Sequence, residues 1–228
     1  MDDEKIRIFP LGDSALTVEF DNAISQAINK KAIALANHIE TEGFPGFIES
    51  VPAYSSTTIF YDLVTVRKHF PGFPTAFDAI KSIAEMALKT LTDTDETHSR
   101  LVEIPVHFDE ESTLDLIYVA EIHGLAPAEV IDIFTSKTYR VFMLGFLPGF
   151  TYMGEVDDRI NTPRKETPRT LLPKGSVGIA GKQTGIYSLE SPGGWHILGR
   201  TDVEMFTPAA NQPTLLQPGD EVRFIAAK

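Results

Sequence analysis

The sequence predicts an α+β protein with a small N-terminal α+β domain over residues 1–92, a linker over residues 93–99 and a β-barrel or sandwich over residues 100–228. Three observations support this division. Two long helical patterns are mixed with short strand-like runs in the first part. The linker contains no apolar side chain. Beyond residue 139 the helical period disappears, and Gly and Pro punctuate short apolar runs, which favours a compact β-structure.

The N-terminal domain is predicted to contain two helices and four strands. The first helix covers residues 24–42, where Asp21 or Asn22 can cap its start and Gly43 can end it. The second covers residues 75–91 and begins with a weak capping signal, a Thr followed three residues later by an Asp. Each helix has one apolar face, which suggests that both cover a sheet. The expected strands are residues 6–9, 15–20, 48–53 and 57–61.

The C-terminal domain is predicted to begin with a strand over residues 102–108, where apolar and polar residues alternate and Pro105 indicates an edge position. Two short helices follow over residues 114–123 and 127–135, separated at Gly124. The remaining strands are expected at residues 139–144, 177–180, 186–189, 195–198 and 222–226. The last of these, at 222–226, would help to close a barrel.

Composition restricts the classes of function. The 228 residues include no Cys, which excludes disulfides, cysteine nucleophiles and cysteine-based metal sites. The net charge of −12 argues against nucleic acid as a partner. No stretch suits a signal peptide or a transmembrane helix, so the expected location is the cytoplasm. The charge is uneven, with eleven acidic residues and one basic residue at 93–132 but seven basic and two acidic residues at 159–200.

The most informative segment repeats Thr-Pro-Arg, ending at Arg164 and again at Arg169. Each Pro restricts the backbone, so the segment is stiff, and arginine suits planar recognition of carboxylate or phosphate. We interpret it as one wall of a site for a small anion, with Lys174 close by in sequence. Because five extended residues span roughly 15 Å, either the chain turns at residues 165–166 or the two arginines serve different groups. An ionic partner on the acidic helices is the alternative to a ligand.

An aromatic-rich turn surrounds Pro148 and Gly149. This pair suits the central positions of a type II turn, because Gly accepts a positive φ. Phe146, Phe150 and Tyr152 lie beside the turn. These rings either line a pocket or fill the core beneath the turn.

A second special turn places Gly193 and Gly194 directly before the only tryptophan, Trp195. Two glycines let the backbone approach either a ligand or another strand, and a tight hairpin is the alternative reading. Arg200 follows the next expected strand. A further glycine-rich loop offers backbone N–H groups and the side-chain amide of Gln183. The six histidines show no spacing of a metal site.

Several motifs occur in order in this half of the chain. They are Gly-Phe-Leu-Pro-Gly-Phe-Thr-Tyr at 145–152, the two Thr-Pro-Arg units, Gly-Ser-Val-Gly-Ile-Ala-Gly at 175–181, Gln-Thr-Gly-Ile-Tyr at 183–187, Ser-Pro-Gly-Gly-Trp at 191–195 and Gly-Arg-Thr at 199–201. With them the chain resembles the family that contains the B subunit of 5-oxoprolinase, the bacterial sporulation kinase inhibitor Kip and proteins named allophanate hydrolase subunit 1.

The resemblance implies a small N-terminal α/β domain followed by a cyclophilin-like β-barrel. It also implies a non-autonomous component of a complex, which works with the C and A subunits of 5-oxoprolinase to convert 5-oxo-L-proline to L-glutamate with ATP hydrolysis. ATP would be a co-substrate, accompanied by Mg and shared with the partner subunits, and no tightly bound cofactor is expected. The alternatives are an inhibitor that docks on a histidine kinase, and a carboxyltransferase-type or allophanate hydrolase-related subunit.

Under this hypothesis, cations beside the transferring phosphoryl group would stabilise its charge. The expected catalytic residues are Arg164, Arg169 and Arg200. No metal ligands and no membrane partner are expected. The expected substrate-binding residues are Phe146, Pro148, Phe150, Tyr152, Lys174, Ser176, Gln183, Tyr187, Gly193, Gly194 and Trp195.

Overall fold

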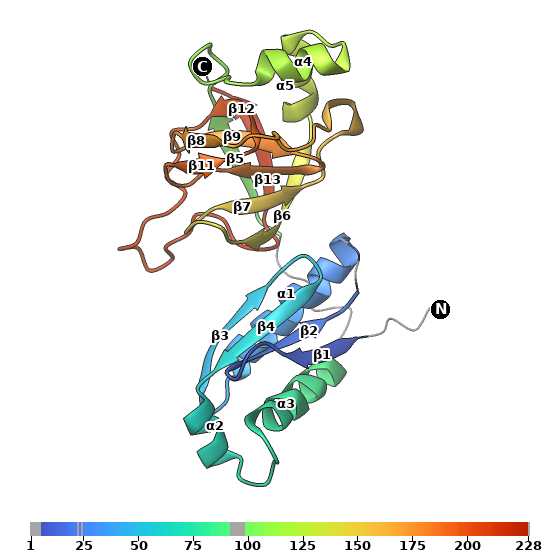
Figure 1. Cartoon of the computed structure of the whole chain (residues 1–228), viewed down its shortest axis with the longest axis vertical. Coiled ribbons are helices and arrows are strands. Elements are labelled where there is room, and N and C mark those ends of the chain that lie inside the picture. The colour runs from blue at the N-terminus through green and yellow to red at the C-terminus, as the bar shows by residue number, and fades with distance from the viewer. Residues whose placement is uncertain (1–5, 22, 24, 92–98, 228) are drawn as a thin grey trace. The chain divides into compact units, whose positions relative to one another are not determined.

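The computed structural model describes residues 6–21, 23, 25–91 and 99–227. Contacts divide the chain into two units, residues 1–97 and 98–228, and each is described by itself (Figure 1). Helices and mostly antiparallel strands occur together, so the α+β prediction is confirmed. Apart from Ser99, the expected linker lies outside the described residues.

The N-terminal unit is a four-stranded antiparallel sheet with the order β1-β2-β4-β3. Leu16 and Val18 of β2 and Ile59 and Tyr61 of β4 share one core with the apolar faces of α1 and α3. Helices therefore cover one face of this sheet. The elements are β1 (Arg7–Pro10), β2 (Ala15–Glu19), α1 (Gln26–Glu42), β3 (Phe47–Pro52), β4 (Ser56–Tyr61), α2 (Leu63–His69) and α3 (Ala76–Thr90).

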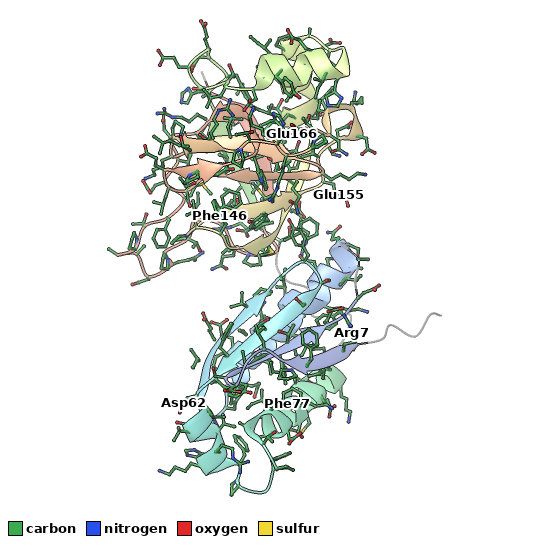
Figure 2. The ribbon with its side chains drawn as sticks, viewed as in Figure 1. Arg7, Asp62, Phe77, Phe146, Glu155 and Glu166 are labelled. Atoms are coloured by element: carbon green, nitrogen blue, oxygen red, sulfur yellow. The ribbon has the colours of Figure 1, made fainter. Side chains whose placement is uncertain are left out.

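Local capping decides where these helices begin. The side chain of Ser25 accepts a hydrogen bond from the Ile28 N–H at 3.2 Å, so Ser25 caps α1 and the expectation of Asp21 was wrong. The other expected cap, Asn22, lies outside the described residues. Thr75, directly before α3, and Asp78 in its first turn form the expected capping box. The sequence missed α2, which is capped by Asp62, labelled in Figure 2. Seven residues are too few to show a helical period.

The C-terminal unit is built on a seven-stranded sheet with the order β12-β9-β10-β7-β6-β13-β5. β5 runs parallel to β13, and the other pairs are antiparallel. His107 and Arg200 exchange backbone hydrogen bonds of 2.7 and 3.1 Å and so join the two outer strands into a nearly closed barrel. The strands are β5 (Leu101–Val106), β6 (Thr138–Leu144), β7 (Thr151–Gly154), β9 (Ser176–Ala180), β10 (Gln183–Ile186), β12 (His196–Arg200) and β13 (Glu221–Ala226).

Two helices, α4 (Leu116–His123) and α5 (Pro127–Thr135), lie together at one end of the barrel (Figure 1). Gly124 separates them in the left-handed conformation, with φ of 66°, as its position predicted. Their buried side chains join the barrel core, where Phe134 stacks on Phe224 at 4.8 Å between ring centroids. Pro105 lies on β5, which is an outer strand of the sheet as expected.

The strand prediction failed where strands are short. The expected strand at 186–189 is wrong, because β10 covers Gln183–Ile186 and ends where that strand was expected to begin. Gln183 was expected in a loop, but it lies in β10, where it pairs with Gly154 and Ala180. β7 was also missed. So were β8 (Arg169–Leu172) and β11 (Ser191–Gly193), which pair with each other in a separate small sheet.

Candidate functional site

The aromatic turn has the predicted geometry. The Phe150 N–H donates to the Leu147 carbonyl at 3.0 Å, and Gly149 has φ of 77°, as a type II turn requires. A Cβ at Gly149 would lie 2.9 Å from the Met205 carbonyl oxygen, so no larger residue fits without movement. The turn also holds Phe146 at φ of 67°, with its ring 60% exposed (Figure 2). Phe146 is therefore presented at the surface beside the buried rings.

The Thr-Pro-Arg segment sends its two arginines to different groups. The chain bends at residues 166–167, just after the expected turn. The guanidinium carbon of Arg164 lies 5.8 Å from the centroid of the Trp195 ring, which is a cation–π contact. Within the described part of the chain, no carboxylate forms an ion pair with Arg164. Arg169 instead forms a two-pronged ion pair with Asp115, with distances of 2.7 and 2.9 Å.

Asp115 connects three parts of the barrel unit. Its buried carboxylate also accepts from the Lys165 ammonium at 2.8 Å and from the Ile197 N–H at 2.8 Å. The Asp115 N–H in turn donates to the Ile197 carbonyl at 2.9 Å. Burial alone would raise the pKa of Asp115, but the hydrogen bonds from Arg169, Lys165 and Ile197 outweigh it, and the pKa is lowered. Asp115 therefore stays ionised and ties the arginine segment to β12 and to the start of α4.

A pocket of about 250 Å³ opens between the aromatic turn, the arginine segment and the tryptophan turn. Eight of the expected site residues meet there, although they come from segments up to 49 positions apart. Sequence reasoning missed Lys165, Pro168 and Pro192, although the first two lie in the segment it singled out. The residues that line the pocket are Phe146, Phe150, Tyr152, Arg164, Lys165, Pro168, Tyr187, Pro192, Gly193, Gly194 and Trp195.

The aromatic rings form the floor of this pocket. Phe150 is 1% exposed and meets Trp195, Tyr187 and Tyr152 edge-on, with centroids 5.5, 5.2 and 4.9 Å away. Phe150 thus belongs to the buried core beneath the turn and also lines the pocket, whereas Phe146 is exposed. Burial raises the pKa of Tyr187 to about 12, against a backbone hydrogen bond from Trp195 and the charge of Arg164. The Tyr187 hydroxyl therefore keeps its proton at neutral pH and can donate it in a hydrogen bond.

Gly193 is needed for packing rather than for a hairpin. A Cβ there would lie 2.4 Å from the Tyr187 hydroxyl and 2.5 Å from Cδ1 of Leu172. The next residue, Gly194, accepts a hydrogen bond from the Lys165 N–H at 2.9 Å. β11 pairs with β8 and β12 pairs with β9, so the alternative reading of a tight hairpin at these glycines is wrong.

Other expected site residues lie elsewhere. The Lys174 ammonium pairs with Glu204 at 2.6 and 2.7 Å, and Ser176 donates to the Pro173 carbonyl at 2.7 Å. Pro148 accepts from the Ser188 hydroxyl at 2.6 Å. None of these residues lines the pocket, and neither does Gln183 or Arg169. Their proposed roles stay predictions.

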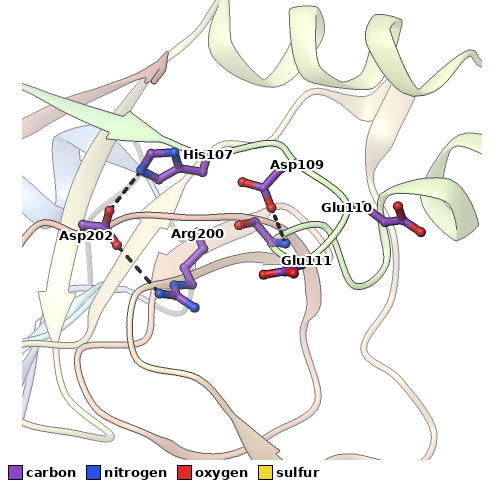
Figure 3. Close-up of a pocket in the computed structure, with 7 residues that line it drawn as sticks. His107, Asp109, Glu110, Glu111, Arg200 and Asp202 are labelled. Atoms are coloured by element: carbon purple, nitrogen blue, oxygen red, sulfur yellow. Dashed lines mark hydrogen bonds and ion pairs between the residues drawn. The ribbon is translucent and has the colours of Figure 1, made fainter. Parts of the chain in front are cut away.

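Arg200 lies at a different, open pocket of about 470 Å³ (Figure 3). Its guanidinium is 3.8 Å from Asp202, which also contacts Nε2 of His107 at 3.1 Å. The loop at 109–111 adds three carboxylates to this pocket. Among the described residues no group of three or more His, Asp or Glu is placed to hold a metal ion. Arg200 is therefore not brought together with Arg164, and its catalytic role stays a prediction.

His196 is a buried titratable group that the sequence did not single out. Its Nε2 lies 2.9 Å from the Pro163 carbonyl, which can only accept, so the neutral ring carries its proton there. Its Nδ1 has no hydrogen-bond partner and is 3.9 Å from Asp115. Burial is the main cause that lowers the pKa of His196, and the charges of Lys165 and Arg169 add to it, against Asp115 and Pro163. The only sequence signal was its position directly after Trp195.

Comparison with known proteins places this architecture in a family. The model of the carboxyltransferase domain, subdomain C and D, matches residues 6–216, which is nearly the whole chain. The chain belongs to this family. It is 46% identical, over 97% of its own length and 92% of the relative, to the B subunit of 5-oxoprolinase from Bacillus subtilis (strain 168). It is 36% identical to the B subunit of 5-oxoprolinase from Escherichia coli O157:H7, over 99% of this chain and 98% of the relative.

A solved structure shares the fold at similar identity. The protein TTHA0988 is 36% identical and matches 94% of this chain with a TM-score of 0.79. This chain spans about 40% of the length of TTHA0988, so that relative continues well beyond the matched module. None of the helices in the described part of the present chain has the length and apolar character needed to cross a membrane.

Proposed function

We propose that this chain is the B subunit of an ATP-dependent 5-oxoprolinase, which opens 5-oxo-L-proline to L-glutamate while it hydrolyses ATP. The observation that carries the proposal is the 46% identity, across 97% of the chain, with a protein named as the B subunit of 5-oxoprolinase. A protein named as a subunit works within an assembly. The chain is accordingly proposed to act with the A and C subunits rather than alone.

The pocket beside Arg164 fits the chemistry of the proposed substrate. 5-Oxoproline carries a carboxylate on a small ring with a lactam group. The guanidinium of Arg164 has no carboxylate partner among the described residues and can pair with the substrate carboxylate, while the ring packs on the aromatic floor. The protonated hydroxyl of Tyr187 can donate to the lactam oxygen. These groups bind and orient the lactam.

Ring opening needs an activated amide. Transfer of the γ-phosphoryl group of ATP to the lactam oxygen would activate the amide carbon. Water can then add there, and the C–N bond breaks as the ring nitrogen takes up a proton. A second water hydrolyses the resulting acyl phosphate, which releases phosphate and leaves the new carboxylate of glutamate. This chain has no Gly-Lys-Ser/Thr phosphate loop. ATP and Mg are therefore proposed to bind at a site shared with the partner subunits, while this chain supplies positive charge beside the lactam.

The test is ATP-dependent ring opening by the reconstituted complex. Arg164→Gln removes the charge and is expected to raise KM for 5-oxoproline about tenfold or more, because a charge-assisted hydrogen bond is lost. Arg159→Gln is the matched control, since Arg159 pairs with Asp157 outside the pocket. An Arg164→Gln enzyme with an unchanged KM would remove this pocket from the mechanism. Absence of ring opening by the wild-type complex would refute the proposed function itself.

A further inference from the structure

Helix α4 exposes an apolar stripe to solvent. Its inner side chains, Leu116, Val119 and Ala120, are buried in the barrel core. A helix that is apolar on all sides is normally covered on all sides, and an exposed apolar patch with a polar border marks an interaction site. Spacing of three or four residues places the exposed side chains along one face. They are Leu114, just before the helix, Ile117, Tyr118 and Ile122, which are 42, 64, 50 and 47% exposed.

The segment that carries this α4 face is acidic, and Lys165, from another segment, is a cation that lies against Tyr118. Glu121 lies on the same side of the helix as Ile117, one turn away, and is exposed. Glu110 and Glu111 are exposed in the loop that leads to the helix (Figure 3). Residues 101–136 contain no Lys or Arg. This charge repels anionic lipid and nucleic acid, and it complements a protein surface whose apolar centre is bordered by basic side chains.

The α4 face also adjoins the candidate site. The ring of Tyr118 stacks on His196 with centroids 5.1 Å apart and an angle of 12° between the rings. The Lys165 ammonium lies 5.8 Å from the centroid of Tyr118, and Lys165 lines the pocket. A protein seated on Tyr118 would therefore lie one side chain away from the pocket wall.

A second copy of this chain is a poor occupant for the α4 face. In a two-fold dimer the same patch meets itself, so the acidic borders of both copies would face one another. TTHA0988 shows that a module of this fold occurs with further protein, because about 40% of its length matches this chain. The occupant is thus better sought in a different protein of complementary charge.

We propose that the α4 face docks another protein of the 5-oxoprolinase complex, through an apolar surface on that protein bordered by Lys and Arg, and so places this partner beside the pocket. This inference rests on the proposed function. It explains why α4 is apolar on both sides. It also explains why the exposed apolar side chains of α4 lie next to the pocket, in a chain that has no Gly-Lys-Ser/Thr phosphate loop of its own.

The test uses surface plasmon resonance to measure binding of the full chain to each purified partner, the C subunit or the A subunit of 5-oxoprolinase. Ile117→Glu and Ile122→Glu are expected to weaken binding to the partner about tenfold or more, as the loss of central apolar contacts does. Val64→Glu is the matched control, since Val64 is an aliphatic residue on a helix of the other unit and, at 73% exposed, is at least as accessible as the two isoleucines. Glu121→Lys should slow association, most clearly at low salt.

The outcomes separate this inference from the proposed function. If the wild-type chain binds and both isoleucine variants bind equally well, the α4 face is not the interface and the inference fails, while the proposed function stands. If the wild-type chain binds neither partner, the proposed function fails and the inference with it. Sedimentation of the chain alone tests whether a second copy of the chain binds the α4 face. Self-association that Ile117→Glu abolishes would overturn the inference in favour of a dimer.

Discussion

Replacing Asp115 by Asn tests how strongly the arginine segment is held. The substitution keeps the shape but removes the charge that accepts hydrogen bonds from Lys165, from Arg169 and from the Ile197 N–H, at 2.7–2.9 Å. Breaking a buried ion pair from one side costs about 3–5 kcal/mol. The side chains of Lys165 and Arg169 are 25 and 28% exposed and can turn partly to water. We therefore expect the free energy of unfolding of the barrel unit to fall by about 2–3 kcal/mol.

The assay is urea denaturation at pH 7 followed by tryptophan fluorescence. Trp195 is the only tryptophan and is 4% exposed, so its emission reports on the barrel unit. The control is Lys174→Ala, which breaks an exposed pair with Glu204 and should cost less than about 1 kcal/mol. An Asp115→Asn protein within about 0.5 kcal/mol of the wild type would refute the reasoning, since that is the range of ordinary surface substitutions.

The difference in stability between the wild type and Asp115→Asn should depend on pH. The folded pKa of Asp115 is lowered from about 3.8, so its stabilising contribution is complete above that value and is lost as the pH falls through the folded pKa. The difference in unfolding free energy between the wild type and Asp115→Asn should therefore disappear in that acidic range. Gly193→Ala should destabilise the barrel by about 1–3 kcal/mol, because the new methyl group overlaps Tyr187 and Leu172. His196 should titrate below pH 6.5 when it is followed by NMR, since burial lowers its folded pKa from that value. Stability from this group is present above its unfolded pKa and is lost as the pH falls through the folded pKa. A His196 that titrates at or above 6.5 would contradict its burial beside Lys165 and Arg169.

The sequence predicted the long helices well because their signals are local. The capping box at Thr75, the glycine at 124 and the apolar stripes of α1 and α3 each depend on residues a few positions apart. The short strands β7, β8 and β11 carry three or four residues each and no such signal. Their pairing depends on which segments meet in the folded barrel.

The candidate site was half predictable for the same reason. Pro and Gly restrict the backbone wherever they occur, so the three segments that meet at the pocket could be recognised without knowing their partners. An acidic residue on the helices was the alternative that the sequence offered as a partner for the arginines. Asp115 itself could not be picked out, because it lies 54 residues from Arg169 and was assigned to the first turn of the helix expected at 114–123. Asp115 in fact precedes α4, and its side chain makes no cap hydrogen bond. Whether Arg164 or Arg169 is left without an ion pair among the described residues therefore depends on the tertiary structure and not on the local sequence.

The way the barrel closes limits how it can recruit other chains. On the free side of β12, Ile197 exchanges hydrogen bonds with Asp115, and Arg200 exchanges them with His107 at the end of β5. A strand whose main-chain groups are already hydrogen-bonded is a poor template for adding a strand from another protein. Addition of a strand to an open sheet edge is also how edge-to-edge aggregation starts. The barrel should therefore recognise other proteins through side chains on its helices and turns, and not by extending its sheet into theirs.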